Sequence, residues 1–179
     1  WCTRMVPIGI WRDVSLRYAG GTKIENVWVR QDVDYEKLTA SITVEPNIES
    51  TGNNKAKIQI EITAPNGEKT TEEYDIDTVA GENKPQYKFD IKNPELWYPN
   101  GYGKQPLYNV LVKLVDGGKV TDEKNVRIGI RKIEWLKNDG ADESAISYIP
   151  KVNGKRIYLK GYNVVPVRQL YGRGHKDIY

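Results

Sequence analysis

Residues 55–78 read KAKIQIEITAPNGEKTTEEYDIDT, and their first half holds the clearest alternation of apolar and polar side chains in the chain. A period of two places alternate side chains on opposite faces of an extended strand. The apolar set is Ala56, Ile58, Ile60 and Ile62. Pro65-Asn66-Gly67 then breaks the pattern, and Asn-Gly tolerates the left-handed dihedral angles of a type I′ turn. The stretch therefore predicts an antiparallel hairpin whose second strand covers residues 70–78.

The same period of two continues on both sides of this hairpin. No segment between Gly20 and Trp135 shows the 3.6-residue apolar period of a helix. Several short alternating strands separated by turns are typical of an all-β antiparallel sandwich or barrel. Polar residues and turn formers at 45–54 predict a loop. The further strands are expected at residues 10–18, 24–34, 38–44, 86–91, 107–115, 120–135 (bent at Gly129) and 157–161. A strand followed by an Asn-Gly turn is expected within 148–156.

Residues 93–108, NPELWYPNGYGKQPLY, combine chain breakers with large aromatic side chains. Proline fixes φ and removes a hydrogen-bond donor, and glycine permits positive φ, so no regular element can run through this stretch. Each aromatic side chain can bury roughly 150–250 Å². Two interpretations remain: a structural lid over one end of a sandwich, or an exposed aromatic platform for a sugar or a partner. The aromatic residues concerned are Trp97, Tyr98, Tyr102 and Tyr108.

Composition indicates a globular chain and argues against several classes of ligand. Charged residues form 28% and hydrophobic residues 39% of the 179 positions, with a net charge of +3 from interleaved signs. No basic stripe predicts nucleic-acid binding, and no apolar run approaches the ~18 residues of a membrane helix. Cys2 and His175 are the only residues of their kinds, so they form neither an internal disulfide nor a Cys/His metal cluster. We predict no metal and no cofactor.

No catalytic constellation assembles from the sequence. His175 has no serine or cysteine nucleophile in a recognisable setting, which favours a surface position. The acidic residues around 72–77 are expected on a solvated strand face. Asp32 and Asp34 share a strand face, but calcium needs six or more oxygen ligands, and nothing nearby supplies them. The sequence therefore predicts no catalytic residue in this chain.

Four short motifs, in this order, resemble glycoside hydrolase family 2, the β-mannosidase, β-galactosidase and β-glucuronidase family. IGIWRDVSLRY at 8–18 is similar to the closing strand of that family's sugar-binding jelly roll. The 93–108 loop resembles the N-P-x-L-W-x-P-N-G-x-G-x-Q-P-L-Y loop of the immunoglobulin-like domain that follows. IGIRKI at 128–133 resembles the strand that ends that domain. VNGK and LKG within 152–161 resemble the start of the catalytic (β/α)8 barrel.

The resemblance implies a middle piece of a larger enzyme. Residues 1–19 would be the last strand of the preceding sugar-binding domain, residues 20–135 an immunoglobulin-like antiparallel β-sandwich, and residues 136–179 a linker and the truncated start of the barrel. The sandwich would act as a non-catalytic spacer between its neighbours. Trp97, Tyr98 and Tyr102 would form an interdomain contact.

The parent implied by the resemblance is a retaining, exo-acting β-glycosidase whose substrate is a β-linked glycoside. Its acid/base and nucleophile would be glutamates on later barrel strands, so this fragment is expected to be inactive. Lys160, Gly161, Asn163 and Pro166 match the β-mannosidase-like pattern K-G-x-N-W-x-P, although Val164 stands where that branch carries tryptophan. Asn163 would lie near the sugar pocket, or else make a structural hydrogen bond. A periplasmic or secreted location is favoured for the parent.

A second reading belongs to another functional class. A free-standing carbohydrate-binding or adhesion β-sandwich would show the same alternating strands and the same aromatic loop. Binding of β-linked oligosaccharides by the isolated chain would favour such a module, whereas no binding would favour the spacer.

Overall fold

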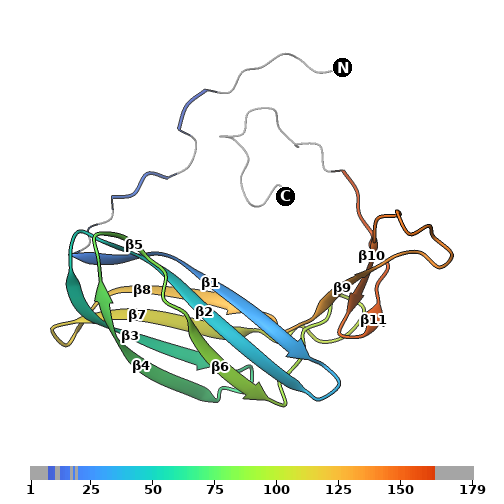
Figure 1. The fold of residues 1–179 in the computed structure, drawn as a ribbon, viewed down its shortest axis with the longest axis horizontal. Helices are drawn as coiled ribbons and strands as arrows, with labels where there is room; N and C mark the ends of the chain where they lie inside the picture. The colour runs from blue at the N-terminus through green and yellow to red at the C-terminus, as the bar shows by residue number, and fades with distance from the viewer. Residues whose placement is uncertain (1–7, 11–12, 17, 19, 164–179) are drawn as a thin grey trace. The chain divides into compact units, whose positions relative to one another are not determined.

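The computed structural model describes residues 8–10, 13–16, 18 and 20–163, and their regular structure consists of strands (Figure 1). One compact unit extends from Ala19 to Tyr158, and a second combines Trp1–Tyr18 with Leu159–Tyr179. None of the described residues forms a helix long and apolar enough to span a membrane. The strands are β1 (Thr22–Asp34), β2 (Thr39–Ser50), β3 (Asn54–Thr63), β4 (Lys69–Thr78), β5 (Gly81–Asn83), β6 (Tyr87–Lys92), β7 (Tyr108–Asp116), β8 (Lys119–Ile128), β9 (Ile133–Leu136), β10 (Ile149–Val152) and β11 (Lys155–Arg156).

Two antiparallel sheets form the body of the larger unit. In one sheet β2 pairs with β1 on one side and with β5 and β6 on the other, and the second sheet has the order β4-β3-β7-β8. Alternate residues of both sheets face each other and exclude water, which is the main driving force for folding. The predicted immunoglobulin-like antiparallel sandwich is confirmed. Its fully buried side chains include Ile24, Ile42, Val44, Ile48, Ile58, Ile60, Val110, Val112 and Leu114.

The hairpin at 55–78 forms as predicted, but its turn is of another type. Strands β3 and β4 pair from Asn54 opposite Thr78 to Thr63 opposite Lys69. The Gly67 N–H donates to the Ala64 carbonyl at 2.9 Å, and Gly67 has a φ of 90°, whereas Asn66 has no positive φ. Pro65 prefers the second position of a type I turn, so a type I turn followed by a left-handed glycine replaces the type I′ turn.

Strand β2 is longer than the sequence predicted, and the loop expected at 45–54 was wrong for its first six residues. Pro46 and Ile48 continue the inward face, and Pro46 is fully buried. The registers of β2 with β6 and with β5 stop on either side of Pro46, so that side of the ladder needs no donor there. At its other end β2 starts at Thr39 rather than at the expected residue 38, because Leu38 lies in the β1–β2 turn with a φ of 51°.

The chain leaves the sandwich after β8 and builds a small sheet. The single strand expected at 120–135 is divided at Gly129: β8 ends at Ile128, and β9 pairs with β10, which in turn pairs with β11 (Figure 1). The strand expected at 157–161 was wrong, because β11 covers only Lys155–Arg156. Residues 11–12 and 17 of the expected strand at 10–18 lie outside the described residues, as does His175.

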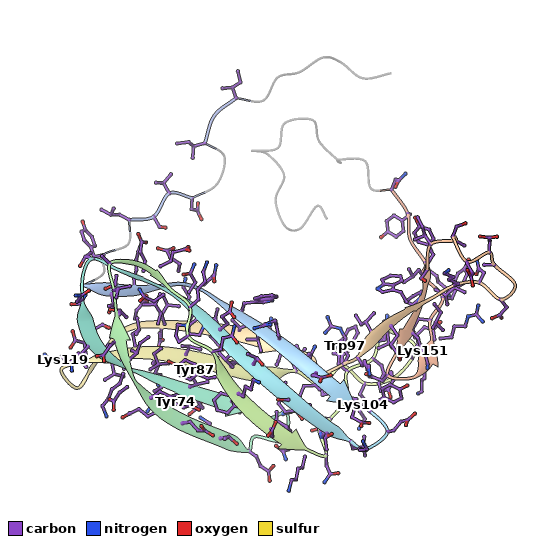
Figure 2. All side chains as sticks on the ribbon, in the orientation of Figure 1. Tyr74, Tyr87, Trp97, Lys104, Lys119 and Lys151 are labelled. Atoms are coloured by element: carbon purple, nitrogen blue, oxygen red, sulfur yellow. The ribbon has the colours of Figure 1, made fainter. Side chains whose placement is uncertain are left out.

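The open sides of the sandwich are closed by polar or aromatic side chains. On one side the Tyr74 ring of β4 lies 4.3 Å from the Tyr87 ring of β6, centroid to centroid (Figure 2). On the other side the Ile24 N–H of β1 donates to the Asp122 carboxylate of β8 at 2.7 Å. These contacts join the two sheets where no backbone ladder can.

Ile60→Ala should lower the free energy of unfolding by about 2–5 kcal/mol, because Ile60 is fully buried and the truncation leaves a cavity. Urea unfolding followed by circular dichroism measures this change. The control is Lys119→Ala at the exposed first residue of β8, which should change the free energy of unfolding by less than about 0.5 kcal/mol. Equal effects of the two substitutions would contradict the packing described.

The stability of the sandwich should fall at alkaline pH through Tyr74. Desolvation and the hydrogen bond to Glu72 raise the pKa of Tyr74 from 10.0 to about 12. The folded state therefore holds this proton more tightly than the unfolded state, and its contribution is complete below pH 10 and lost as pH rises toward 12. Tyr74→Phe should lose less stability than the wild type between about pH 10 and about pH 12 in urea unfolding. Parallel losses would exclude this role.

Candidate functional site

The loop that joins β6 to β7 passes from one sheet of the sandwich to the other. Asn93 ends β6 with a φ of 51°, and its N–H donates to the Leu38 carbonyl at 2.8 Å. The Glu95 N–H donates to the Tyr108 hydroxyl at 2.9 Å. Pro94 between them is buried. The start of the loop is thus attached both to the β1–β2 turn and to the first residue of β7.

The centre of the loop is compact because it forms its own hydrogen bonds. The Tyr98 N–H donates to the Lys104 carbonyl at 2.9 Å, and the Tyr102 N–H donates to the Pro99 carbonyl at 3.0 Å. A Cβ atom on Gly103 would lie 2.9 Å from the Tyr98 ring, so only glycine fits there without displacement. This loop is the ordered structure that its proline, glycine and aromatic content suggested.

Trp97 attaches the loop to the chain that leaves the sandwich. Its backbone N–H donates to the Ile130 carbonyl at 2.8 Å, and the Arg131 guanidinium carbon lies 4.8 Å from the centroid of its ring. A Cβ atom on Gly129 would lie 2.6 Å from the Trp97 ring. Trp97 therefore lies at the end of the sandwich opposite the β7–β8 turn, next to the small sheet (Figure 2).

Asn153 makes one hydrogen bond to this loop and two to Lys132, just before β9. Its side-chain nitrogen donates to the Trp97 carbonyl at 2.9 Å, and its side-chain oxygen accepts the Lys132 N–H at 2.8 Å. Its own N–H donates to the Lys132 carbonyl at 3.0 Å. Asn153 is buried and has a φ of 45°, a conformation that asparagine adopts more readily than most residues. We call Trp97, Lys132 and Asn153 the junction.

The other two aromatic residues also contact the segment after β8. The Tyr102 hydroxyl accepts the Tyr158 N–H at 3.0 Å. The Lys155 ammonium lies 4.6 Å from the centroid of the Tyr98 ring, within cation–π range. Trp97, Tyr98 and Tyr102 therefore all contact the segment after β8 within the larger unit. Their proposed contact with another domain remains a prediction.

Sequence reasoning missed Asn153 as a junction residue. Asn153 and Gly154 form the turn between β10 and β11, and no local pattern indicates that this asparagine is buried. Gly154 shows a second long-range contact, because a Cβ atom there would lie 2.8 Å from the Tyr35 ring. Asn163, the predicted sugar-pocket residue, is exposed, and the chain beyond it lies outside the described residues. Its role remains a prediction.

Several carboxylates of the described residues pair with lysines or cap turns. Glu73 pairs with Lys57 at 2.6 Å, and Glu61 pairs with Lys69 at 2.9 Å. Asp34 caps the β1–β2 turn, and its hydrogen bonds from Lys37, backbone first, lower its pKa. Among the described residues, no three histidine, cysteine, aspartate or glutamate side chains could hold a metal ion together.

The fold and the junction define a β-sandwich module of the immunoglobulin-like type. The model of the family "Glycosyl hydrolases family 2" matches residues 22–131, and this chain belongs to that family.

Its relatives in this family are much longer proteins. The chain is 28% identical over 173 residues to beta-mannosidase B of Thermothelomyces thermophilus. The aligned region covers 97% of this chain and 20% of that protein. It is also 28% identical over 182 residues to beta-mannosidase B of Emericella nidulans. The crystal structure of a beta-D-mannosidase from Dictyoglomus thermophilum superposes with a TM-score of 0.73 at 26% identity, over 84% of this chain and 18% of that one. The chain thus spans about a fifth of the length of the relatives it matches.

Asn153→Ala should lower the free energy of unfolding by about 2–4 kcal/mol, because it leaves two backbone groups without partners and keeps an unfavourable φ. Asn153→Gly relieves the φ but not the lost bonds, so it should cost less than Asn153→Ala. Chemical unfolding of both variants separates the two effects. A change below about 0.5 kcal/mol for Asn153→Ala would show that the junction does not stabilise the unit.

Proposed function

We propose that this chain is a non-catalytic spacer of a longer, β-mannosidase-like enzyme that hydrolyses terminal β-glycosides. The observation that carries this proposal is the junction, where the Asn153 side chain bonds to the aromatic loop and to the chain after β8 at once. Such bonds fix the small sheet against the end of the sandwich. The names of the relatives favour a β-mannoside as the substrate of the parent.

In this proposal the reacting groups lie outside the chain. A retaining glycosidase places two carboxyl groups about 5–5.5 Å apart across the scissile bond. The carboxylates of the sandwich that pair with lysines, such as Glu61 and Glu73, serve the sheet surface instead. Residues 1–19 and 136–179 are proposed to lead from a sugar-binding domain and into a catalytic barrel, with the β-linked substrate bound by the parent.

The 179-residue chain should not release nitrophenol from a nitrophenyl β-mannoside, whereas a longer polypeptide that carries it should. The reason is that the proposed acid/base and nucleophile are absent from the chain. Absorbance of the product measures both samples, and the circular dichroism of a folded sheet is the control for the shorter one. Turnover by the purified chain would overturn the spacer. Millimolar or tighter binding of β-linked manno-oligosaccharides to it would favour a free-standing carbohydrate-binding module instead.

A further inference from the structure

The small sheet β9–β10–β11 exposes several large apolar side chains. Ile133 is 48% exposed, Trp135 54% and Tyr148 70%. Tyr158, two residues after β11, is exposed as well. Large apolar side chains that gather on one small element mark an interaction surface more often than isolated ones do.

The register of the sheet gathers these side chains on one face. Trp135 lies opposite Pro150, and Ile133 lies opposite Val152. Side chains alternate along a strand, so these four share a face, and Tyr148 continues that row of β10. We call Ile133, Trp135 and Tyr148 the apolar rim of this face.

The opposite face of the small sheet is mixed. Glu134 and Lys151 are cross-strand partners there with their charged atoms 3.8 Å apart, and Leu136 and Ile149 form an apolar pair beside them. Leu136 is 40% exposed, so the face that carries Trp135 and Tyr148 exposes more large apolar side chains. Pro150 and Val152, in the middle of that face, are already buried, while the rim beside them is open. Cover over that face is thus incomplete.

The apolar rim is held in a fixed orientation relative to the sandwich. Strands of four, four and two residues are too short to be stable without packing against something else. The junction and the bond from the Tyr158 N–H to the Tyr102 hydroxyl supply that attachment. A rigid surface loses little conformational entropy when a partner binds, which favours docking.

We propose that the apolar rim is the docking site for the domain that follows this sandwich in the same polypeptide. The chain spans about a fifth of its relatives, so most of a comparable polypeptide is available as a partner. The rim lies on the last strands before the larger unit ends at Tyr158, and elements consecutive in sequence usually pack side by side. Half-exposed tryptophan and tyrosine are the side chains that anchor such contacts. This docking site rests on the proposed spacer function, because the partner is another domain of the proposed parent enzyme.

The test compares Trp135→Ser/Tyr148→Ser in the 179-residue chain and in the longer polypeptide. In the chain both side chains are largely exposed, so the unfolding midpoint of the sandwich should move by less than about 2 °C. In the longer polypeptide the same substitutions should lower it by about 4 °C or more, because they open a buried contact. Trp28→Ser is the matched control: Trp28 is 58% exposed on the outer face of β1 and should have a small effect in both proteins.

Two results would overturn the docking site. Equal, small shifts in both proteins would mean that the rim faces solvent in the parent. A large shift in the 179-residue chain would mean that the rim is already covered there, by a second copy if sedimentation shows a dimer that the substitutions abolish. These readouts are independent of catalysis. A longer polypeptide without glycosidase activity would refute the proposed function, yet leave the docking result standing.

Discussion

The two hydrogen bonds of the Asn153 side chain hold the end of this structure together. One amide group satisfies a carbonyl of the aromatic loop and an N–H of the chain leaving β8, at 2.9 and 2.8 Å. Both partners belong to irregular backbone, which has no ladder to supply these bonds. A buried polar backbone group without a partner costs about 1–3 kcal/mol, so this one side chain stabilises both the loop and the start of the small sheet.

Two positions near the junction require glycine because an aromatic ring packs against the backbone there. Gly129 and Gly103 lie where a Cβ atom would meet the rings of Trp97 and Tyr98 at 2.6 and 2.9 Å, and neither has a positive φ. What they contribute is the absence of a side chain, which lets a ring lie directly on backbone. The loop therefore holds its rings by close approach, and Arg131 covers the Trp97 ring at 4.8 Å.

Local patterns predicted what local physics controls. The alternation at Ile58 and Ile60 predicted a buried strand face, because burial of one face is the condition for a strand to alternate. The strand through Pro46 could not be predicted this way. Proline is tolerated there because the pairing of β2 with β6 stops at Val44 and its pairing with β5 starts at Ile48. The role of Asn153 could not be predicted from local patterns either, because its partner Trp97 lies 56 residues away in the sequence.

The proposed spacer would contribute to catalysis by limiting the motion of the domains on either side of it. Displacement of a reacting group by 1 Å can cost on the order of 100-fold in rate, so a domain that positions others needs a stiff connection more than a reactive surface. In the sandwich, stiffness comes from two packed sheets. At the exit of the chain no sheet continues, and there the Asn153 amide, the Tyr102 hydroxyl and the Trp97 ring replace the ladder. The same end carries the small sheet with its exposed apolar rim, so the hydrogen bonds that attach the exit of the chain also fix the position of the proposed docking surface.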